Sequence, residues 1–96
     1  MGAEEELMSF LESNPYYFDL TRDSVVLRVV VSLKDGGKSV RQIAAAFKLE
    51  EPKLFLKLED LVSHGVLDKT SASGAIVFFL SFEGERFVEL YEKARG

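Results

Sequence analysis

The sequence contains no cysteine and only one histidine, His64. The missing cysteines exclude disulfide bonds and zinc sites of the cysteine type, so a metal cluster would need mostly carboxylate ligands. The longest apolar run, residues 25–33, is interrupted by Arg28 and is too short to span a bilayer. Residues 1–6 are acidic and lack the basic segment and apolar run of a secretory signal. We therefore expect a cytoplasmic protein with no metal, no cofactor and no membrane partner.

Positive charge is also scarce. The 96 residues include 12 lysines and arginines against 16 acidic residues, which gives a net charge of −4. Nucleic-acid-binding domains are usually basic, because neutralised phosphates supply much of their affinity, although a local basic face is sufficient. A chain of this length builds one modest core, which does not favour a deep active-site cleft. The sequence gives no reason to expect an enzyme.

Apolar spacing predicts helices through the first two thirds of the chain. A helix over residues 4–13 ends at Asn14-Pro15, and residues 16–20 form an apolar, aromatic link. A second helix runs from a cap at Thr21 or Asp23 to about residue 34, although its β-branched residues also suit a buried strand.

Two short helices and a hairpin follow. Ser39 and Gln42 form a capping box that begins the third helix, and Pro52 suits the first turn of a fourth helix that runs to about residue 64. Residues 66–69 and 75–82 are extended and are separated by the turn residues 70–74, which predicts a β-hairpin with a five-residue loop. Ser81 can cap a last helix.

This order of elements is typical of a winged helix-turn-helix. We predict a mainly α fold of about five helices with a β-hairpin wing. Residues 1–96 form a single domain, with an amino-terminal helix and link at 1–20, a winged-helix core at 23–81 and a carboxy-terminal helix at 82–96.

Three stretches resemble a known family. Residues 39–49, Ser-Val-Arg-Gln-Ile-Ala-Ala-Ala-Phe-Lys-Leu, resemble the first helix and turn of the winged helix-turn-helix motif. Leu54, Leu58 and Leu61, followed by Gly65-Val66-Leu67, resemble its recognition helix, and residues 79–86 are similar to the segment that leaves the wing. The resemblance covers residues 23–90 and is to small bacterial and archaeal regulators, namely the multiple-antibiotic-resistance, phenolic-acid and arsenic repressors. It implies a DNA-binding transcriptional regulator that works as a homodimer on double-stranded DNA.

The family contacts DNA through the recognition helix and the wing. The cationic candidates for phosphate contact here are Lys38, Arg41, Lys48, Lys53, Lys57 and Lys69. Phe55 and Leu56 depart from the family, because they occupy positions of polar base readers and carry no donors or acceptors. Three interpretations are open. In the first, Leu56 contacts a thymine methyl group, and in the second, Phe55 and Leu56 together form a protein interface. In the third, Phe55 packs at the core edge beside Val62 and Leu56 is a scattered surface leucine.

The departures favour a second function, a winged-helix protein-interaction module that does not bind DNA directly. The wing loop, residues 70–74, points the same way because it carries no lysine or arginine.

The terminal helices carry more apolar surface than one small domain needs. The candidates for a homodimer interface are Leu7, Phe10, Leu11, Phe87, Leu90 and Tyr91. The alternative is that the two terminal helices simply cover each other.

Overall fold

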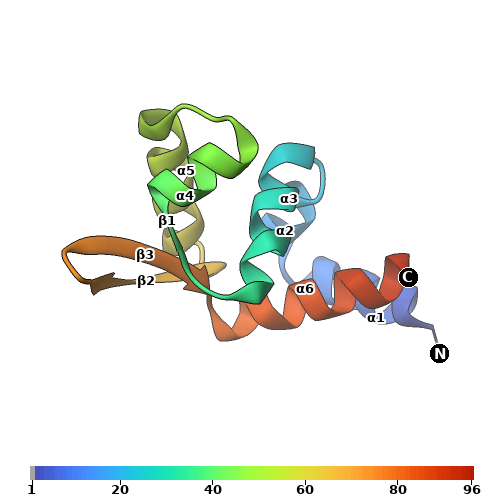
Figure 1. Ribbon diagram of the computed structural model, residues 1–96. Helices are drawn as coiled ribbons and strands as arrows, with labels where there is room; N and C mark the ends of the chain where they lie inside the picture. Colours follow the sequence, from blue (N-terminus) through green and yellow to red (C-terminus); the bar gives the residue numbers. More distant parts are fainter. Residues whose placement is uncertain (1) are drawn as a thin grey trace.

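A computed structural model describes residues 2–96 and has the winged helix-turn-helix fold (Figure 1). The elements are α1 (Ala3–Ser13), α2 (Pro15–Leu20), α3 (Ser24–Ser32), a short 3₁₀ turn η1 (Leu33–Asp35), β1 (Lys38–Ser39), α4 (Val40–Phe47), α5 (Glu51–Ser63), β2 (Leu67–Ala72), β3 (Ala75–Leu80) and α6 (Phe82–Arg95). The predicted fold class is therefore confirmed, with α2 as a helix beyond the five expected.

The helix starts follow local capping chemistry. The Ser39 hydroxyl accepts from the Gln42 backbone N–H at 3.2 Å, and the Gln42 side chain accepts from the Ser39 N–H at 2.9 Å, which confirms the predicted capping box of α4. Of the two caps considered for α3, Asp23 is the one used, and it accepts from the Val26 N–H at 3.1 Å. These ends form where the sequence places them because each needs only residues three positions apart.

The β-branched segment is a helix, not a strand. Helix α3 lies between the helix-turn-helix on one side and the terminal helices on the other (Figure 1), and Leu27, Val29 and Val30 are buried. A helix that is apolar nearly all round requires cover on more than one side, and this position supplies it.

The aromatic link forms a short helix, α2, which the sequence analysis did not assign. Pro15 occupies the first turn of α2, where its missing N–H costs nothing, and Tyr17 and Leu20 are buried. The proline that ends α1 therefore also begins the next helix.

The wing differs from the prediction in two ways. Its loop is two residues long, not five, because residues 70–72 pair with β3 in a continuous antiparallel ladder. Ser73 and Gly74 form the turn with φ of 52° and 80°, the left-handed pair that suits a tight hairpin. A third strand was not predicted. The short strand β1 pairs with β3 through Lys38 opposite Phe78 and gives the sheet order β1-β3-β2.

Helix α6 is fixed to the base of the wing by a close joint. Ser81 accepts from the Gly84 N–H at 2.9 Å and donates to the Gly65 carbonyl at 2.7 Å. Gly84 packs directly against the backbone of Val66, where a Cβ atom would collide with the Val66 carbonyl oxygen. The start of α6 therefore has a fixed position relative to the wing and to the end of α5.

Candidate nucleic-acid interface

Helices α4 and α5 form the helix-turn-helix. Lys48 closes α4 in the left-handed conformation, with φ of 56°, and the Leu49 N–H donates to the Ala44 carbonyl at 3.0 Å. Leu54, Leu58 and Leu61 form the buried face of α5. The opposite face of α5, which carries Leu56, is exposed. The wing projects from the same side of the molecule as α4 and α5 (Figure 1).

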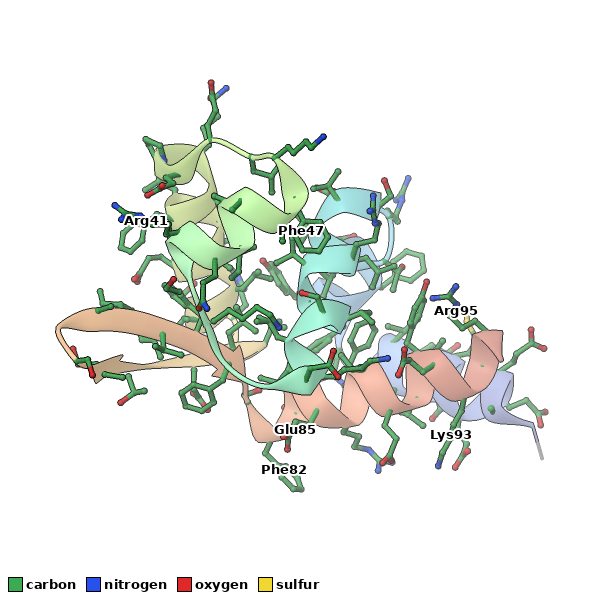
Figure 2. The ribbon with its side chains drawn as sticks, viewed as in Figure 1. Arg41, Phe47, Phe82, Glu85, Lys93 and Arg95 are labelled. Atoms are coloured by element: carbon green, nitrogen blue, oxygen red, sulfur yellow. The ribbon has the colours of Figure 1, made fainter. Side chains whose placement is uncertain are left out.

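Four of the six predicted cations have acidic partners on α5 or at its start, and the six differ in accessibility. The side chains of Arg41 and Lys53 are each 87% exposed, and Arg41 points away from the body (Figure 2). Lys57 is half-buried, whereas Lys48 and Lys69 are exposed. Lys38 turns inward instead, where its Nζ donates to the Ser32 carbonyl at 3.0 Å. Of the six, Lys38 is the least available to a phosphate.

Acidic side chains accompany most of these cations. The ion pairs are Arg41–Glu51 at 3.9 Å, Lys53–Glu50 at 3.7 Å, Lys57–Asp60 at 3.5 Å and Lys69–Glu59 at 2.7 Å. Within residues 2–96, Lys48 forms no ion pair at this separation. Because exposed ion pairs are weak, a phosphate can replace the acid in the three longer pairs more easily than in Lys69–Glu59.

Phe55 and Leu56 have different surroundings. Phe55 is half-buried and meets Phe78 edge-on, with 6.2 Å between ring centroids. It therefore packs at the core edge, against Phe78 of the wing. Leu56 is 69% exposed on the outer face of α5. Of the two residues, only Leu56 offers a side chain to a partner, whether DNA or protein.

The wing tip presents a neutral surface. Residues 70–74 are exposed and uncharged, and Ile76, which lies opposite Ser71 in the ladder, is 40% exposed. A wing of this kind offers hydrogen bonds and apolar contact but no charge for phosphates or for the minor groove.

A polar cluster that the sequence did not predict holds the carboxyl end of α5. The Tyr16 hydroxyl donates to Asp60 Oδ2 at 2.7 Å, and the Tyr16 ring stacks on His64 with 3.9 Å between centroids. Burial, together with this bond to Asp60, raises the pKa of the Tyr16 phenol. The same hydrogen bond, with Lys57 and His64 nearby, lowers the pKa of Asp60. Helix α2 therefore fixes the orientation of the carboxyl end of α5.

Replacing Tyr16 by phenylalanine should weaken the fold in a pH-dependent way. The lost bond to the Asp60 carboxylate costs about 1 kcal/mol near pH 7, since the site is part-exposed. A depressed pKa contributes stability above the unfolded value of about 4, and this contribution is lost as the pH falls through the folded value. Urea unfolding should therefore show a smaller difference between wild type and Tyr16→Phe at pH 3 than at pH 7. Tyr91→Phe is the control, because the Tyr91 hydroxyl forms no hydrogen bond within residues 2–96, and an equal loss there would contradict the role of Asp60.

The predicted dimer residues lie mostly inside the protomer. Helices α1 and α6 lie side by side (Figure 1), and Leu11, Phe87 and Leu90 are buried there. Leu7, Phe10 and Tyr91 are half-buried, and all three pack on the same core. At the three buried residues the terminal helices cover each other, so within one protomer these side chains offer little surface to a second copy.

Other apolar side chains remain exposed on the same helical layer. Met8 on α1 is 50% exposed and Phe18 on α2 is 44% exposed. Phe82, at the start of α6, is 83% exposed and points away from the body (Figure 2). The sequence alone does not distinguish these three residues, because helical spacing identifies an apolar face without showing which part a neighbouring helix covers.

The length and hydropathy of the helices show whether any of them could cross a membrane. Among residues 2–96, none of the helices is both long enough and apolar enough to cross a bilayer.

The sequence matches no protein-family model and no curated protein. Solved structures are similar to this chain. HlyU from Vibrio cholerae has a TM-score of 0.70 at 18% identity, over 96% of this chain and 95% of that chain. A homodimeric winged helix-turn-helix DNA-binding domain from Mycobacterium bovis, a possible ArsR-family transcriptional regulator, has a TM-score of 0.70 at 16% identity, over 94% and 79%. TubR, of type III plasmid segregation, has a TM-score of 0.69 at 17% identity, over 82% and 83%. These likenesses show a shared fold.

Proposed function

We propose that this chain is a small DNA-binding regulator that acts as a homodimer. The observation that carries the proposal is the helix-turn-helix itself. Helix α5 exposes Leu56 on its outer face, with Lys53 and Lys57 on the flank toward α3 and the wing packed against Phe55 on the other flank. The fold is shared along nearly the whole chain with HlyU and with a homodimeric DNA-binding domain, which supports the same use of it here.

In this proposal α5 enters the major groove. Lys53 and Lys57 release their long ion pairs and contact phosphates, while Arg41 and Lys48 contact the backbone from α4 and the turn. Leu56 contacts a thymine methyl group. Lys69 and Lys38 contribute less, because each is already held by a short polar contact within the chain.

The homodimer would use the layer of α1, α2 and α6. Met8 and Phe18 are exposed on this layer, and shallow apolar grooves run beside Met8. Two copies joined there would present two recognition helices, whose separation sets the spacing of the DNA half-sites.

The test of this proposal is binding of the purified protein to duplex DNA over a series of salt concentrations. We expect an affinity that falls linearly with salt on a double-logarithmic plot, because bound phosphates release counterions. The same titration should give two chains per site. Absence of binding at low salt would contradict the proposal.

A second function is favoured by one observation, the exposed Leu56 on a surface whose cations are mostly paired with acids. In this alternative the outer face of α5 binds a protein and not DNA. Leu56→Asp should then abolish partner binding in a pull-down with little change in thermal stability, because the side chain is 69% exposed. Phe82→Asp, at an apolar side chain that is 83% exposed at the start of α6, is the comparison variant and should retain partner binding. A large loss of stability in Leu56→Asp would show instead that Leu56 belongs to the core.

A further inference from the structure

An apolar groove lies between α3 and the helix-turn-helix, and we refer to it as the α3–α5 groove. Its volume is about 330 Å³, and Val25 and Val29 of α3 face Leu54 and Leu58 of α5 across it. Small-molecule sites have volumes of about 300 to 1,000 Å³, so this groove is large enough for a small ligand.

On the side of α3, the most apolar helix, the groove is open to solvent. Val29 and Leu58 are buried at its floor, but Val25 at its mouth is 42% exposed. The packing of α3 on α5 therefore leaves part of an apolar surface in contact with water, and a ligand with an alkyl chain would cover it.

The charged residues that line the groove are mainly cationic. They are Lys48, Lys53 and Lys57 against the single acid Glu50. Lys53 is held by Glu50 at 3.7 Å and Lys57 by Asp60 at 3.5 Å, while Lys48 forms no ion pair in the described part of the chain. Long, exposed ion pairs contribute little, so an incoming carboxylate can replace them at low cost. In a chain with net charge −4, this is a local concentration of positive charge around an apolar floor.

We propose that the α3–α5 groove binds a medium-chain fatty carboxylate. The alkyl chain lies on the valines and leucines, and the carboxylate contacts the lysines at the rim. The apolar floor selects the chain, with about fourfold in affinity for each methylene that is fully buried. The lysines select an anionic head over a neutral or cationic one.

A regulatory consequence rests on the proposed function. Lys53 and Lys57 belong both to the rim of the groove and to the surface proposed to contact phosphates. A carboxylate held by these lysines competes with DNA for the same charges, so the ligand should release DNA. Ligand binding itself does not depend on DNA.

The first experiment is calorimetric titration of the free protein with octanoate, hexanoate, octanol and octylamine, below the concentrations at which they form micelles. We expect saturable binding of octanoate, binding of hexanoate weaker by about fifteenfold because it is two methylenes shorter, and no binding of octylamine. Absence of octanoate binding would overturn the proposal. Equal binding of octylamine would also overturn it, because the lysines would then play no part.

Two matched variants locate the site. Val25→Glu places a carboxylate at the mouth of the groove, whereas Ile76→Glu makes the same kind of change on the wing, at a side chain that is 40% exposed compared with 42% for Val25. Octanoate binding should weaken by at least about tenfold in Val25→Glu, and Ile76→Glu should bind like wild type. Thermal melts show whether each variant is folded. If a variant is unfolded, the site is located in the wild-type protein instead, by the chemical-shift changes of the Val25 and Val29 amides when octanoate is added. Octanoate-dependent shifts elsewhere would contradict the assignment.

A final experiment adds octanoate to the DNA complex and separates the two proposals. Release of DNA from the complex, at octanoate concentrations that saturate the free protein, supports both the proposed function and the ligand site. Binding of octanoate without any binding of DNA contradicts the proposed function but still supports the ligand site. A protein that binds DNA but not octanoate contradicts the ligand site alone.

Discussion

Gly84→Ala is expected to destabilise the fold by about 2 to 3 kcal/mol, which for a domain of this size corresponds to a fall in Tm of about 10 °C or more. The added methyl group would collide with the Val66 carbonyl oxygen and approach the Ser81 hydroxyl to 3.3 Å. The neighbour on one side is backbone, which cannot rotate away as a side chain can. Either α6 or the base of the wing must therefore move.

The sign of this change is informative, because the same substitution usually stabilises a helix. In a solvent-exposed helix interior, glycine to alanine gains about 0.5 to 1 kcal/mol. Thermal and urea unfolding followed by circular dichroism would measure the effect. Arg86→Ala, an exposed position two residues further along α6, is the control and should change the stability by about 0.5 kcal/mol or less. A neutral or stabilising Gly84→Ala would show that the joint between α6 and the wing is loose.

The need for glycine at this position could not be predicted from the sequence. Gly84 lies in the first turn of α6, where the local sequence gives no reason to require glycine. The residue that it contacts, Val66, is 18 positions away in the chain. The Ser39–Gln42 capping box was predictable for the opposite reason, since both partners belong to one helical turn. The same contrast explains the Tyr16–Asp60 hydrogen bond, which joins residues 44 positions apart.

The errors in the wing and in the aromatic link have a common cause. Thr70, Ser71 and Ala72 have the composition of a loop, but pairing with β3 satisfies their backbone and extends the strand. Pro15 was interpreted as the end of one helix, although its fixed φ equally suits the start of the next. In both cases local preference allowed two structures, and contacts outside the segment selected one of them, namely pairing with β3 for the wing and packing on the core for the link.

The candidate site shows the same limit. The outward position of Leu56 follows from helical phase, and the structure agrees with it. The acids that pair with Lys53 and Lys57 were visible in the sequence only as a near balance of charge, while their actual partners, Glu50 and Asp60, depend on side-chain geometry. Helical phase predicts which side chains face a partner, but it does not determine how much charge they have free to offer.

The double substitution Lys53→Ala with Lys57→Ala is expected to weaken DNA binding by at least about tenfold at low salt. It should also reduce the slope of log affinity against log salt concentration by about two, because each lysine that contacts a phosphate accounts for about one released counterion. Both effects should be equal on different DNA sequences, since phosphate contacts carry no base information. Fluorescence anisotropy with a labelled duplex over a salt series measures both quantities.

The matched control is Lys34→Ala with Lys93→Ala, which removes the same charge from η1 and α6. These lysines also have acidic partners, Glu92 at 2.7 Å and Glu89 at 4.0 Å, so the change in ion pairing is comparable. If the α5 lysines contact phosphates, the control pair should leave the salt slope unchanged. An unchanged slope in the Lys53 and Lys57 variant would contradict phosphate contact by α5, and the exposed Leu56 would then identify α5 as a protein-binding helix. An equal decrease in both double variants would mean that total charge, and not this surface, governs the affinity.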